Sequence, residues 1–439
     1  MVFQELRSKI ERRQAVIGVI GLGYVGLPVA ATFAAAGFRV IGLDIKAERV
    51  ATINAGHSPI EGDEPGLAEL LAMVVAEERL HATTEVAELG EADVVLISVE
   101  TPVGDDHRPR YDALQSACRS LGPVMKRGAL IVVESTIAPG TINNLVLPLL
   151  EEMSGRRANV DFLLGACPER VMPGRLLANL HGMSRVCGGS SPEAAAVMVE
   201  LYRHFVQADL DTADVVTAEL VKTTENTYRD VQIAFANEVA LICEANGADV
   251  WRVRELVNKS PYRQMHLPGA GVGGHCIPKD PWLLASAVEG KVPLQLIPAA
   301  RAVNDRMPLH VADLTVEALS SAGRPLPESR VAVLGYAYLE NSDDTRNSPS
   351  AALVARLEEH GVGVIIHDPW VEGYQGDLMD HVSACDAVVV MVGHHQYQEL
   401  NLDALKNVMR TPILIDGRGL FDPAQVRLVG FVYRGIGRA

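Results

Sequence analysis

A cysteine in a glycine-rich loop is the residue of this chain whose surroundings best suit covalent chemistry. Cys276 lies in the run GAGVGGHCIPKD, with His275 before it and Asp280 four residues later. An isolated cysteine is more often a small buried apolar residue, but a polar, glycine-rich loop is where a reactive thiol is found. Because an ordinary thiol is little ionised at neutral pH, a nucleophilic Cys276 requires a cation or a base beside it.

A lysine and an asparagine at helical spacing could provide that environment. Lys222 and Asn226 are four residues apart in a segment that reads as a helix, so both side chains lie on one face. An ammonium and a carboxamide that point the same way can bind an oxyanion forming at carbon and can favour a thiolate. The alternative is a solvated lysine beside a surface asparagine, and the choice depends on whether the fold brings this helix to the Cys276 loop.

The run GLGYVG, from Gly21 to Gly26, carries the pattern of a dinucleotide-binding turn. It follows an apolar strand-like run and precedes a helix-like one, which is the context in which such glycines bring a pyrophosphate to a helix N-terminus. Asp44 ends the next strand, where a carboxylate binds the ribose 2′-hydroxyl and repels a 2′-phosphate. These residues predict NAD rather than NADP. A second match, Gly269 to Gly274, precedes no helix, and we interpret it as a loop whose glycines crowd backbone N–H groups around a substrate.

Two further loops follow predicted strands, at the edge where open α/β sheets bind ligands. Their sequences are ESTIAPGT at residues 134–141 and CPERVMPG at residues 167–174, and either could instead be a plain turn. The pair His394 and His395 has no third metal ligand nearby in the sequence, so we interpret it as structural and predict no metal.

Short β-branched runs separated by helix-like segments predict parallel sheets covered on both faces. A long helix without proline or glycine is expected from Thr217 to Asn246, ending at Gly247; at 1.5 Å per residue it would span about 45 Å, enough to connect domains and to pack against a second subunit. The fold class is therefore α/β, with two Rossmann-like doubly wound domains joined by a long central helix. The predicted strands are 16–20, 40–43, 94–99, 130–133, 331–334, 362–366, 387–392, 413–415 and 429–432.

Composition narrows the class of partner. A formal charge of -16 disfavours nucleic acid and anionic lipid as partners. Six scattered cysteines fit reduced thiols better than a secreted disulfide framework, and we see neither a signal peptide nor a membrane-spanning run. We therefore expect a cytoplasmic enzyme whose anionic substrate needs a local cationic pocket.

Six strings together resemble the UDP-glucose/GDP-mannose dehydrogenase family, in order and over nearly the whole chain. They are GLGYVGLP, ESTIAPGT, CPERVMPG, AELVKTTEN, PGAGVGGHCIPKDPW and NSDDTRNSPS. The resemblance implies an NAD-dependent enzyme that oxidises the C6 alcohol of a nucleotide sugar to a carboxylate. It also implies an N-terminal NAD-binding Rossmann domain at residues 1–210, a central helical dimerisation domain with the cysteine loop at 211–325, and a C-terminal UDP-sugar-binding domain at 326–439.

The resemblance also implies residue roles. Cys276 would be the nucleophile, Lys222 and Asn226 the oxyanion pair, and Asp280 the acid/base carboxylate. Thr136 and Glu169 would order the hydrolytic water. The implied NAD contacts are Gly21, Gly23, Tyr24, Val25, Asp44, Arg49, Thr101, Thr136, Lys279 and Arg346. The implied substrate contacts are Glu169, Arg170, Val171, Met172, Lys222, Asn226, Arg263, Gly273 and Arg418.

One position departs from the family pattern. Many members have a lysine shortly before the DDTR motif, whereas this chain has Leu339. The residues around it, His275, and Pro281-Trp282 resemble the branch that acts on UDP-N-acetylhexosamines, particularly UDP-N-acetyl-D-mannosamine; UDP-N-acetylglucosamine and UDP-glucose stay open as substrates. Two other classes also stay open: a two-electron hydroxyacid-type dehydrogenase, which needs no thiol, and a non-catalytic NAD-binding regulator, which would lack an intact cysteine loop.

Overall fold

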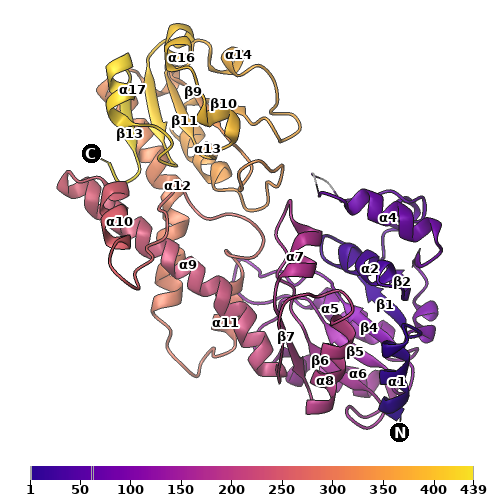
Figure 1. Cartoon of the computed structure of the whole chain (residues 1–439). Coiled ribbons are helices and arrows are strands. Elements are labelled where there is room, and N and C mark those ends of the chain that lie inside the picture. Colours follow the sequence, from indigo (N-terminus) through magenta and orange to yellow (C-terminus); the bar gives the residue numbers. More distant parts are fainter. Residues whose placement is uncertain (1, 61, 63, 439) are drawn as a thin grey trace. The chain divides into compact units, whose positions relative to one another are not determined.

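The computed structural model describes residues 2–60, 62 and 64–438. It divides into two compact units that interleave along the chain. The first comprises Met1–Glu225 and Trp282–Val292, and the second comprises Asn226–Pro281 and Pro293–Ala439. Each unit contains one β-sheet (Figure 1). The division into three domains that the sequence suggests stays a prediction.

The sheet of the first unit has the strand order β3-β2-β1-β4-β5-β6-β7-β8, and all neighbouring pairs are parallel except β6 and β7. The order reverses between β1 and β4, so the carboxyl ends of these strands form the crevice where open α/β sheets bind ligands. The strands are β1 Val16–Ile20, β2 Arg39–Leu43, β3 Leu80–Thr83, β4 Val94–Ile97, β5 Leu130–Val133, β6 Leu163–Ala166, β7 Arg185–Gly189 and β8 Leu210–Asp214.

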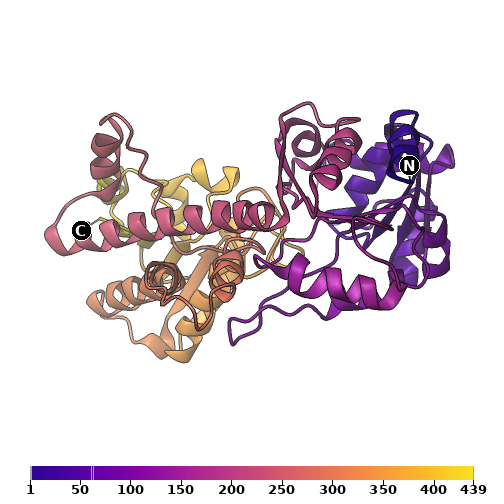
Figure 2. The same cartoon turned by 90° about the horizontal axis from the view of Figure 1, so that it is seen from below.

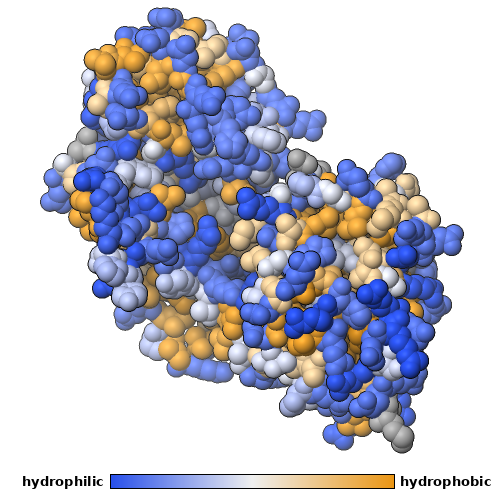
Figure 3. Space-filling model, in the orientation of Figure 1, coloured by the Kyte–Doolittle hydropathy of each residue, from blue (hydrophilic) through white to orange (hydrophobic). Residues whose placement is uncertain are grey.

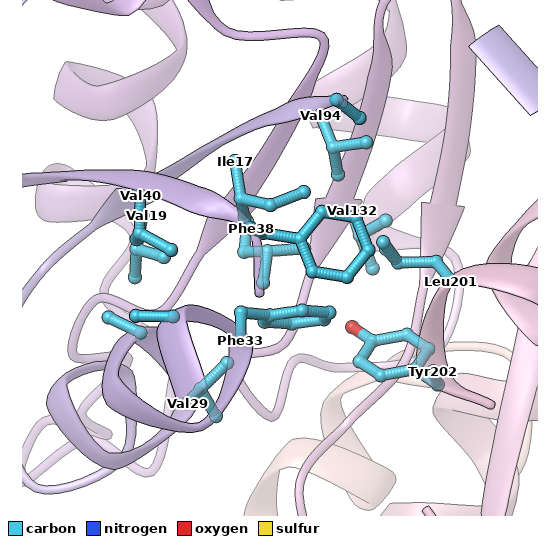
Figure 4. Packing of buried hydrophobic residues seen from close by; sticks show 14 of the residues in the cluster. Ile17, Val19, Val29, Phe33, Phe38, Val40, Val94, Val132, Leu201 and Tyr202 are labelled. Carbon is cyan, nitrogen blue, oxygen red and sulfur yellow. The ribbon is translucent and has the colours of Figure 1, made fainter. Parts of the chain in front are cut away.

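Helices cover both faces of this sheet because successive strand residues point to opposite faces. Ile17 and Val19 of β1 pack with one set of helices, and Ile20 packs with the other. Figure 4 shows the first core, where the rings of Phe33 and Tyr202 lie beside each other. The helical segments are α1 Val2–Glu11, α2 Gly26–Ala35, α3 Ala47–Asn54, α4 Leu67–Ala76, η1 Val86–Glu91, α5 Asp112–Leu121, η2 Ile142–Val146, α6 Leu147–Ser154, α7 Leu176–Gly182 and α8 Pro192–Tyr202. Helix α11 Asp280–Ser286 begins in the second unit and continues in the first from Trp282.

Helix α9 spans Val215–Asn246 and is one unbroken helix of 32 residues (Figure 2). Gly247, in the left-handed region at φ 69°, follows its last turn, as the sequence predicts. The helix begins two residues earlier than expected. It starts in the first unit and ends in the second.

The sheet of the second unit is entirely parallel, with the order β10-β9-β11-β12-β13. Alternate strand residues again feed two cores, so this sheet is also doubly wound and the predicted fold class is confirmed. Its strands are β9 Arg330–Leu334, β10 Gly363–His367, β11 Ala387–Val390, β12 Ile413–Asp416 and β13 Val432–Gly435. Its other segments are α10 Val250–Asn258, α12 Leu296–Ser321, η3 Leu326–Glu328, α13 Pro349–Glu359, α14 Leu378–Val382, α15 His395–Gln398, α16 Leu402–Val408 and α17 Pro423–Val429.

The predicted strand at 429–432 is wrong in position. Helix α17 continues to Val429, Gly430 ends it at φ 101°, and β13 begins only at Val432. Hydrophilic residues cover most of the face shown in Figure 3, with separate apolar patches between them. No described helix combines the length and apolar character needed to cross a bilayer.

Candidate active site

The turn between β1 and α2 has the close geometry that its glycines allow. A Cβ at Gly26 would lie 1.9 Å from the Gly21 carbonyl oxygen, so no other residue fits there without moving the backbone. Gly21 itself has φ 89°. At Gly23, by contrast, a Cβ would meet nothing within 4 Å. The turn is therefore open at Gly23, beside the first N–H groups of α2, where a pyrophosphate can approach the helix.

Asp44, after the end of β2, is brought to this turn as predicted. Its Oδ2 accepts from the Leu22 N–H at 2.9 Å and from Arg49 Nη1 at 3.0 Å, and its Oδ1 accepts from the Lys46 N–H at 2.9 Å. The carboxylate is buried and fixed beside the glycine turn. In that place it favours an unphosphorylated ribose. The open turn and this carboxylate together fit a bound NAD.

Tyr24 links the glycine turn to the CPERVMPG loop through a residue that the sequence analysis missed. Its hydroxyl donates to Glu64, whose Oε1 also accepts from the Gly174 N–H at 2.7 Å. Glu64 Oε2 accepts from the Leu176 N–H at 3.2 Å. Nothing in the sequence around Glu64 distinguishes it from an ordinary surface carboxylate, so only the fold identifies this bridge.

The ESTIAPGT loop is held from two sides. Buried Thr101 donates its hydroxyl hydrogen to the Thr136 carbonyl at 2.6 Å. Glu219 of α9 accepts from the Gly140 N–H at 2.6 Å and from the Ile142 N–H at 2.8 Å. Burial raises the pKa of Glu219 to about 7, against the lowering effect of these two N–H donors. Glu219 lies in the AELVKTTEN string, but its partners are some 80 residues away and only the fold reveals them.

In the CPERVMPG loop, Glu169 is buried and its carboxylate meets Arg185 of β7 at 2.5 Å. The Arg170 guanidinium already has hydrogen-bond partners within the protein. Its Nε and Nη2 donate to Glu225 at 3.1 and 2.5 Å, and its Nη1 donates to the Ser184 carbonyl at 2.5 Å. Val171 is half-buried and Met172 is exposed. The substrate contacts predicted for Arg170, Val171 and Met172 stay predictions.

Lys222 lies on α9 within the first unit, and its side chain is 9% exposed. Among the residues that the structure describes, no carboxylate forms a salt bridge with it. A buried ammonium without an anionic partner is costly, and an anion at this place would offset that cost. Burial argues against a fully solvated lysine, and the approach of this helix to the Cys276 loop stays a prediction.

Cys276 is exposed, whereas the other five cysteines of the chain are buried. Its loop packs closely against the 338–349 segment of the second unit: the Gly274 N–H donates to the Arg346 carbonyl at 2.9 Å, and Asn347 Nδ2 donates to the Gly274 carbonyl at 3.1 Å. A Cβ at Gly274 would lie 2.7 Å from the Tyr338 ring. These contacts fix the backbone immediately before the thiol.

The glycines at 269–274 lie against other parts of the second unit. A Cβ at Gly273 would lie 2.6 Å from Tyr338 Cβ, and one at Gly271 would lie 2.9 Å from two prolines, Pro308 and Pro349. These glycines permit close packing of the protein against itself, and the predicted substrate contact at Gly273 stays a prediction. The Cys276 loop can pack in this position because these residues have no side chain. The local sequence cannot show this requirement.

Asn226 and Asp280 meet directly in the second unit. Asn226 Nδ2 donates to Asp280 Oδ2 at 2.5 Å, while Lys279 Nζ lies 3.0 Å from Asp280 Oδ1. Asp280 is fully buried at the start of α11, and its backbone N–H donates to the Cys276 carbonyl at 2.9 Å. An amide nitrogen carries two hydrogens, so Asn226 can hold Asp280 and still donate to a second acceptor.

The charged side chains near the Cys276 thiol include two cations. Burial lowers the pKa of His275 to about 4, and the positive charges of Lys279 and Arg346 add to this effect. The His275 ring is therefore neutral at pH 7 and carries no positive charge. Arg346 makes a bidentate pair with Asp344, through Nε at 2.9 Å and Nη2 at 2.5 Å. The hydrogen bond and the charge of Asp344 raise the pKa of Arg346, with smaller contributions from Tyr338 and Cys276. Burial, with Asp344 and Cys276 adding to it, raises the pKa of Tyr338 to about 12. Arg346 and Lys279 are thus the cations of this loop.

Arg418 follows β12, and its guanidinium packs on the same glycine-rich run. Its Nε donates to the Met391 carbonyl at 2.5 Å, and a Cβ at Gly269 would lie 2.8 Å from its Nη1. Leu339, in the place of the family lysine, is partly exposed. Arg263 lies in an exposed loop and contacts only neighbouring carbonyls among the described residues. The structure therefore joins Arg418, but not Arg263, to the Cys276 run.

His394 has a structural role, as interpreted from the sequence. It is fully buried, its Nδ1 accepts from the Asn341 N–H at 2.9 Å, and its Nε2 lies 3.2 Å from Asp368 Oδ2. Asp368 also accepts from the Tyr336 and Ala337 N–H groups at 2.6 and 2.9 Å. This network orders the segment that leads into the 338–349 loop.

Three family models match the chain in order. They are described as the NAD binding domain, the central domain and the UDP binding domain of the UDP-glucose/GDP-mannose dehydrogenase family, and they match residues 15–206, 216–306 and 332–423.

Named relatives agree with these matches over nearly their full lengths. The chain is 43% identical over 423 residues to the UDP-N-acetyl-D-mannosamine dehydrogenase of Pyrococcus horikoshii, covering 96% of this chain and 99% of the relative. A solved structure of the UDP-D-ManNAc dehydrogenase of P. horikoshii superposes with a TM-score of 0.92 at 42% identity, covering 96% and 99%. An NDP-N-acetyl-D-galactosaminuronic acid dehydrogenase structure from Methanosarcina mazei Go1 superposes with a TM-score of 0.87 at 38% identity, covering 98% of both chains.

Proposed function

Because the chain belongs to the UDP-glucose/GDP-mannose dehydrogenase family, we propose that it oxidises the C6 alcohol of UDP-N-acetyl-D-mannosamine to the uronate through a thioester on Cys276. It is an NAD-dependent nucleotide-sugar dehydrogenase. The observation that carries the covalent step is the exposed thiol of Cys276, on a loop seated by glycines next to cationic Arg346 and Lys279. The proposal requires the residues of the first unit to act on the same carbon as this thiol.

The first half of the proposed reaction makes and captures an aldehyde. Asp280, or a water that it holds, removes the proton of the C6 hydroxyl. NAD, when bound, supplies the acceptor for the hydride that leaves this carbon in each of the two oxidations. The Cys276 sulfur then forms a bond to the aldehyde carbon, and Lys222 and Asn226 donate hydrogen bonds to the resulting oxyanion.

The second half releases the acid. The second oxidation turns the thiohemiacetal into a thioester, and water ordered by Thr136 and Glu169 hydrolyses it. The burial of Lys222, which forms no salt bridge with any described residue, supports its assignment to the oxyanion, and the hydrogen bond of Asn226 to Asp280 supports a shared place for the amide and the base. Covalent retention explains how the aldehyde stays bound between the two oxidations.

The choice of sugar rests on the relatives. The P. horikoshii relative is named for UDP-N-acetyl-D-mannosamine, whereas the M. mazei structure is named for an N-acetylgalactosaminuronic acid. This chain has Leu339 where many family members carry a lysine, so it lacks that positive charge shortly before the DDTR motif. UDP-N-acetylglucosamine and UDP-glucose are the alternative substrates, and a two-electron hydroxyacid-type oxidation is the remoter one.

Substrate panels measured by NADH formation test this proposal. We expect the highest kcat/KM with UDP-N-acetyl-D-mannosamine and the release of two NADH and one acidic product per sugar, because a single hydride transfer stops at the aldehyde. GDP-mannose serves as the control nucleotide sugar. A stoichiometry of one NADH with an accumulating carbonyl product would instead place the chain among two-electron dehydrogenases.

We also propose that the chain forms a homodimer through α9. Tyr228, Phe235 and Ile242 are 64%, 59% and 59% exposed and are spaced by seven residues, so these large apolar side chains form a row on one face of the helix. Such a row on a surface usually marks a protein contact, and a second copy of the same helix offers a matching row.

Sedimentation equilibrium should give twice the chain mass of 47.2 kDa. Phe235→Glu places a charge in the centre of the row and should yield monomers. Leu428→Glu, at an exposed apolar residue of α17, is the control and should stay dimeric. Equal association of both variants would show that α9 is not the interface.

A further inference from the structure

A buried charge cluster lies behind the CPERVMPG loop in the first unit. Its centre is Arg185, the first residue of β7, which is only 2% exposed. Arg185 Nη2 lies 2.5 Å from Glu169 Oε2, and Nη1 lies 3.7 Å from Glu134 Oε1. One guanidinium thus faces two buried carboxylates, at the ends of two neighbouring strands, β5 and β6.

The walls of the cluster hold the guanidinium in one orientation. Its carbon Cζ lies 4.7 Å from the centre of the Tyr202 ring and 5.3 Å from that of Phe205, so aromatic faces cover it. Tyr202 belongs to the aromatic core of Figure 4, and its hydroxyl donates to Glu134 Oε1 at 2.7 Å. Arg185 therefore has no room to turn away from the two carboxylates.

Glu134 is the carboxylate of this cluster that can become protonated and so lose its negative charge. Its Oε2 also accepts from Ser98 Oγ at 2.9 Å. Burial raises the pKa of Glu134 to about 7; the nearby Arg185 lowers it and the nearby Glu169 raises it further. When Glu134 is protonated, the cluster holds one guanidinium and one carboxylate, the pair of Arg185 with Glu169. Tyr202 and Cys167 are the other titratable groups that face Arg185. Burial, with the charge of Glu134 adding to it, raises the pKa of Tyr202, and the hydrogen bond with Cys187, followed by burial, raises the pKa of Cys167.

Both oxygens of Glu169 are restrained. Oε1 accepts from the Arg170 backbone N–H at 2.8 Å, and Oε2 meets Arg185. The Glu169 backbone N–H also donates to the Glu134 carbonyl at 3.3 Å. A carboxylate oxygen has two acceptor positions, so Oε1 can still accept a hydrogen from water. The carboxylate is therefore held in place while it keeps the capacity to orient a water molecule.

We propose that Arg185 is a positioning residue for hydrolysis of the thioester, because it fixes the Glu169 carboxylate as an anionic acceptor for the attacking water. The inference rests on the proposed function, since it assumes the thioester on Cys276. Arg185 does not touch the reacting atoms in this scheme. It acts through Glu169, by charge and by orientation.

The step balances without a further reagent. The water oxygen forms a bond to the acyl carbon while the bond from this carbon to the Cys276 sulfur breaks. One proton of the water goes to the departing thiolate, and the carboxylic acid then releases its other proton to solvent. No electrons are transferred in this hydrolysis step, so the step forms no NADH. Both NADH molecules form before it, and NADH formation reports on the rate of hydrolysis only through steady-state turnover.

Rapid-mixing measurement of NADH on the full-length enzyme with NAD and UDP-N-acetyl-D-mannosamine tests the proposal. In Arg185→Lys we expect an unchanged burst of two NADH per site, followed by steady-state turnover that is slower by about 100-fold, the order of loss expected from a small misplacement of a positioned group. Mass spectrometry of the quenched protein should detect the sugar acyl group on Cys276.

Matched variants separate this role from a structural one. Glu134→Gln removes a charge from the same cluster but keeps the Arg185 pair with Glu169, so its burst and its steady-state rate should resemble the wild type. If Arg185→Lys does not fold, the double variant Arg185→Met/Glu134→Gln leaves only one buried carboxylate and should show the same hydrolysis defect. An equal loss of burst and steady-state rates, or wild-type hydrolysis in either Arg185 variant, would overturn the proposal.

Glu169→Gln distinguishes a failure of this inference from a failure of the proposed function. If Glu169→Gln accumulates the acyl group and the Arg185 variants do not, only the role of Arg185 is wrong. If no variant accumulates an acyl group and the wild type releases one NADH per sugar, the thioester itself is wrong.

Discussion

Cys276→Ser is expected to bind NAD and the UDP-sugar and to form uronate at least about a thousandfold more slowly than the wild type. Loss of the nucleophile in other covalent enzymes costs up to about a millionfold in kcat. A serine hydroxyl is hardly ionised at neutral pH, and Arg346 and Lys279, the cations beside this loop, can favour a thiolate but not an alkoxide. The thiol is needed only after the first oxidation, so the defect belongs to the second NADH.

The measurement is pre-steady-state NADH formation together with isothermal titration of NAD and the UDP-sugar. Cys385→Ser is the matched control, because that buried sulfur donates only to the His381 carbonyl at 3.4 Å, a bond that a hydroxyl can replace. Uronate formation at the wild-type rate in Cys276→Ser would exclude covalent catalysis at this residue.

Lys222→Ala should slow formation of the second NADH by about 100- to 1000-fold, the usual loss when one donor to an oxyanion is removed. Lys222 is buried and has no salt bridge among the residues described, so its charge is available to an anion that forms during the reaction. Because the interaction develops mainly in the transition state, kcat and kcat/KM should fall together.

Lys259→Ala is the control for this variant, since Lys259 is exposed and pairs with Glu255 at 3.2 Å on the surface. Asn226→Ala is a less clean test because Asn226 also holds Asp280. A rise in KM for the sugar with an unchanged kcat would assign Lys222 to ground-state binding of the substrate instead of the oxyanion.

Helix α9 is central to the site because it carries residues with different tasks on successive turns. Glu219 holds the ESTIAPGT loop, Lys222 offers a buried ammonium, and Asn226 holds Asp280. The outward row that begins at Tyr228 starts only two residues later. An interface on this row would therefore stabilise the same helix that presents the proposed oxyanion donors.

The amino-acid sequence by itself determined the fold class and identified the loops that are proposed to carry the chemistry. Strands such as Val16–Ile20 and Leu130–Val133 are continuous β-branched or apolar runs, and the structure has them with the predicted bounds. Strands β3, β6, β7 and β8 were not predicted; in β7 and β8, with the sequences RVCGG and LDTAD, polar residues and glycine interrupt the apolar run. Their extended form comes from pairing with neighbouring strands rather than from local propensity.

Only the tertiary structure decided which partners the reactive residues have. Residue type and spacing in the sequence are enough to identify Cys276, Lys222 and Asp280 as candidate catalytic residues. That Cys276 is exposed, that Lys222 is buried without a salt bridge among the described residues, and that Asn226 reaches Asp280 depend on contacts between segments more than 50 residues apart. Arg185 illustrates the limit best: a charged residue at the start of a short strand becomes meaningful only when folding removes it from water beside two carboxylates. Local sequence specifies what a side chain can do, whereas burial and long-range neighbours decide its charge and its partner.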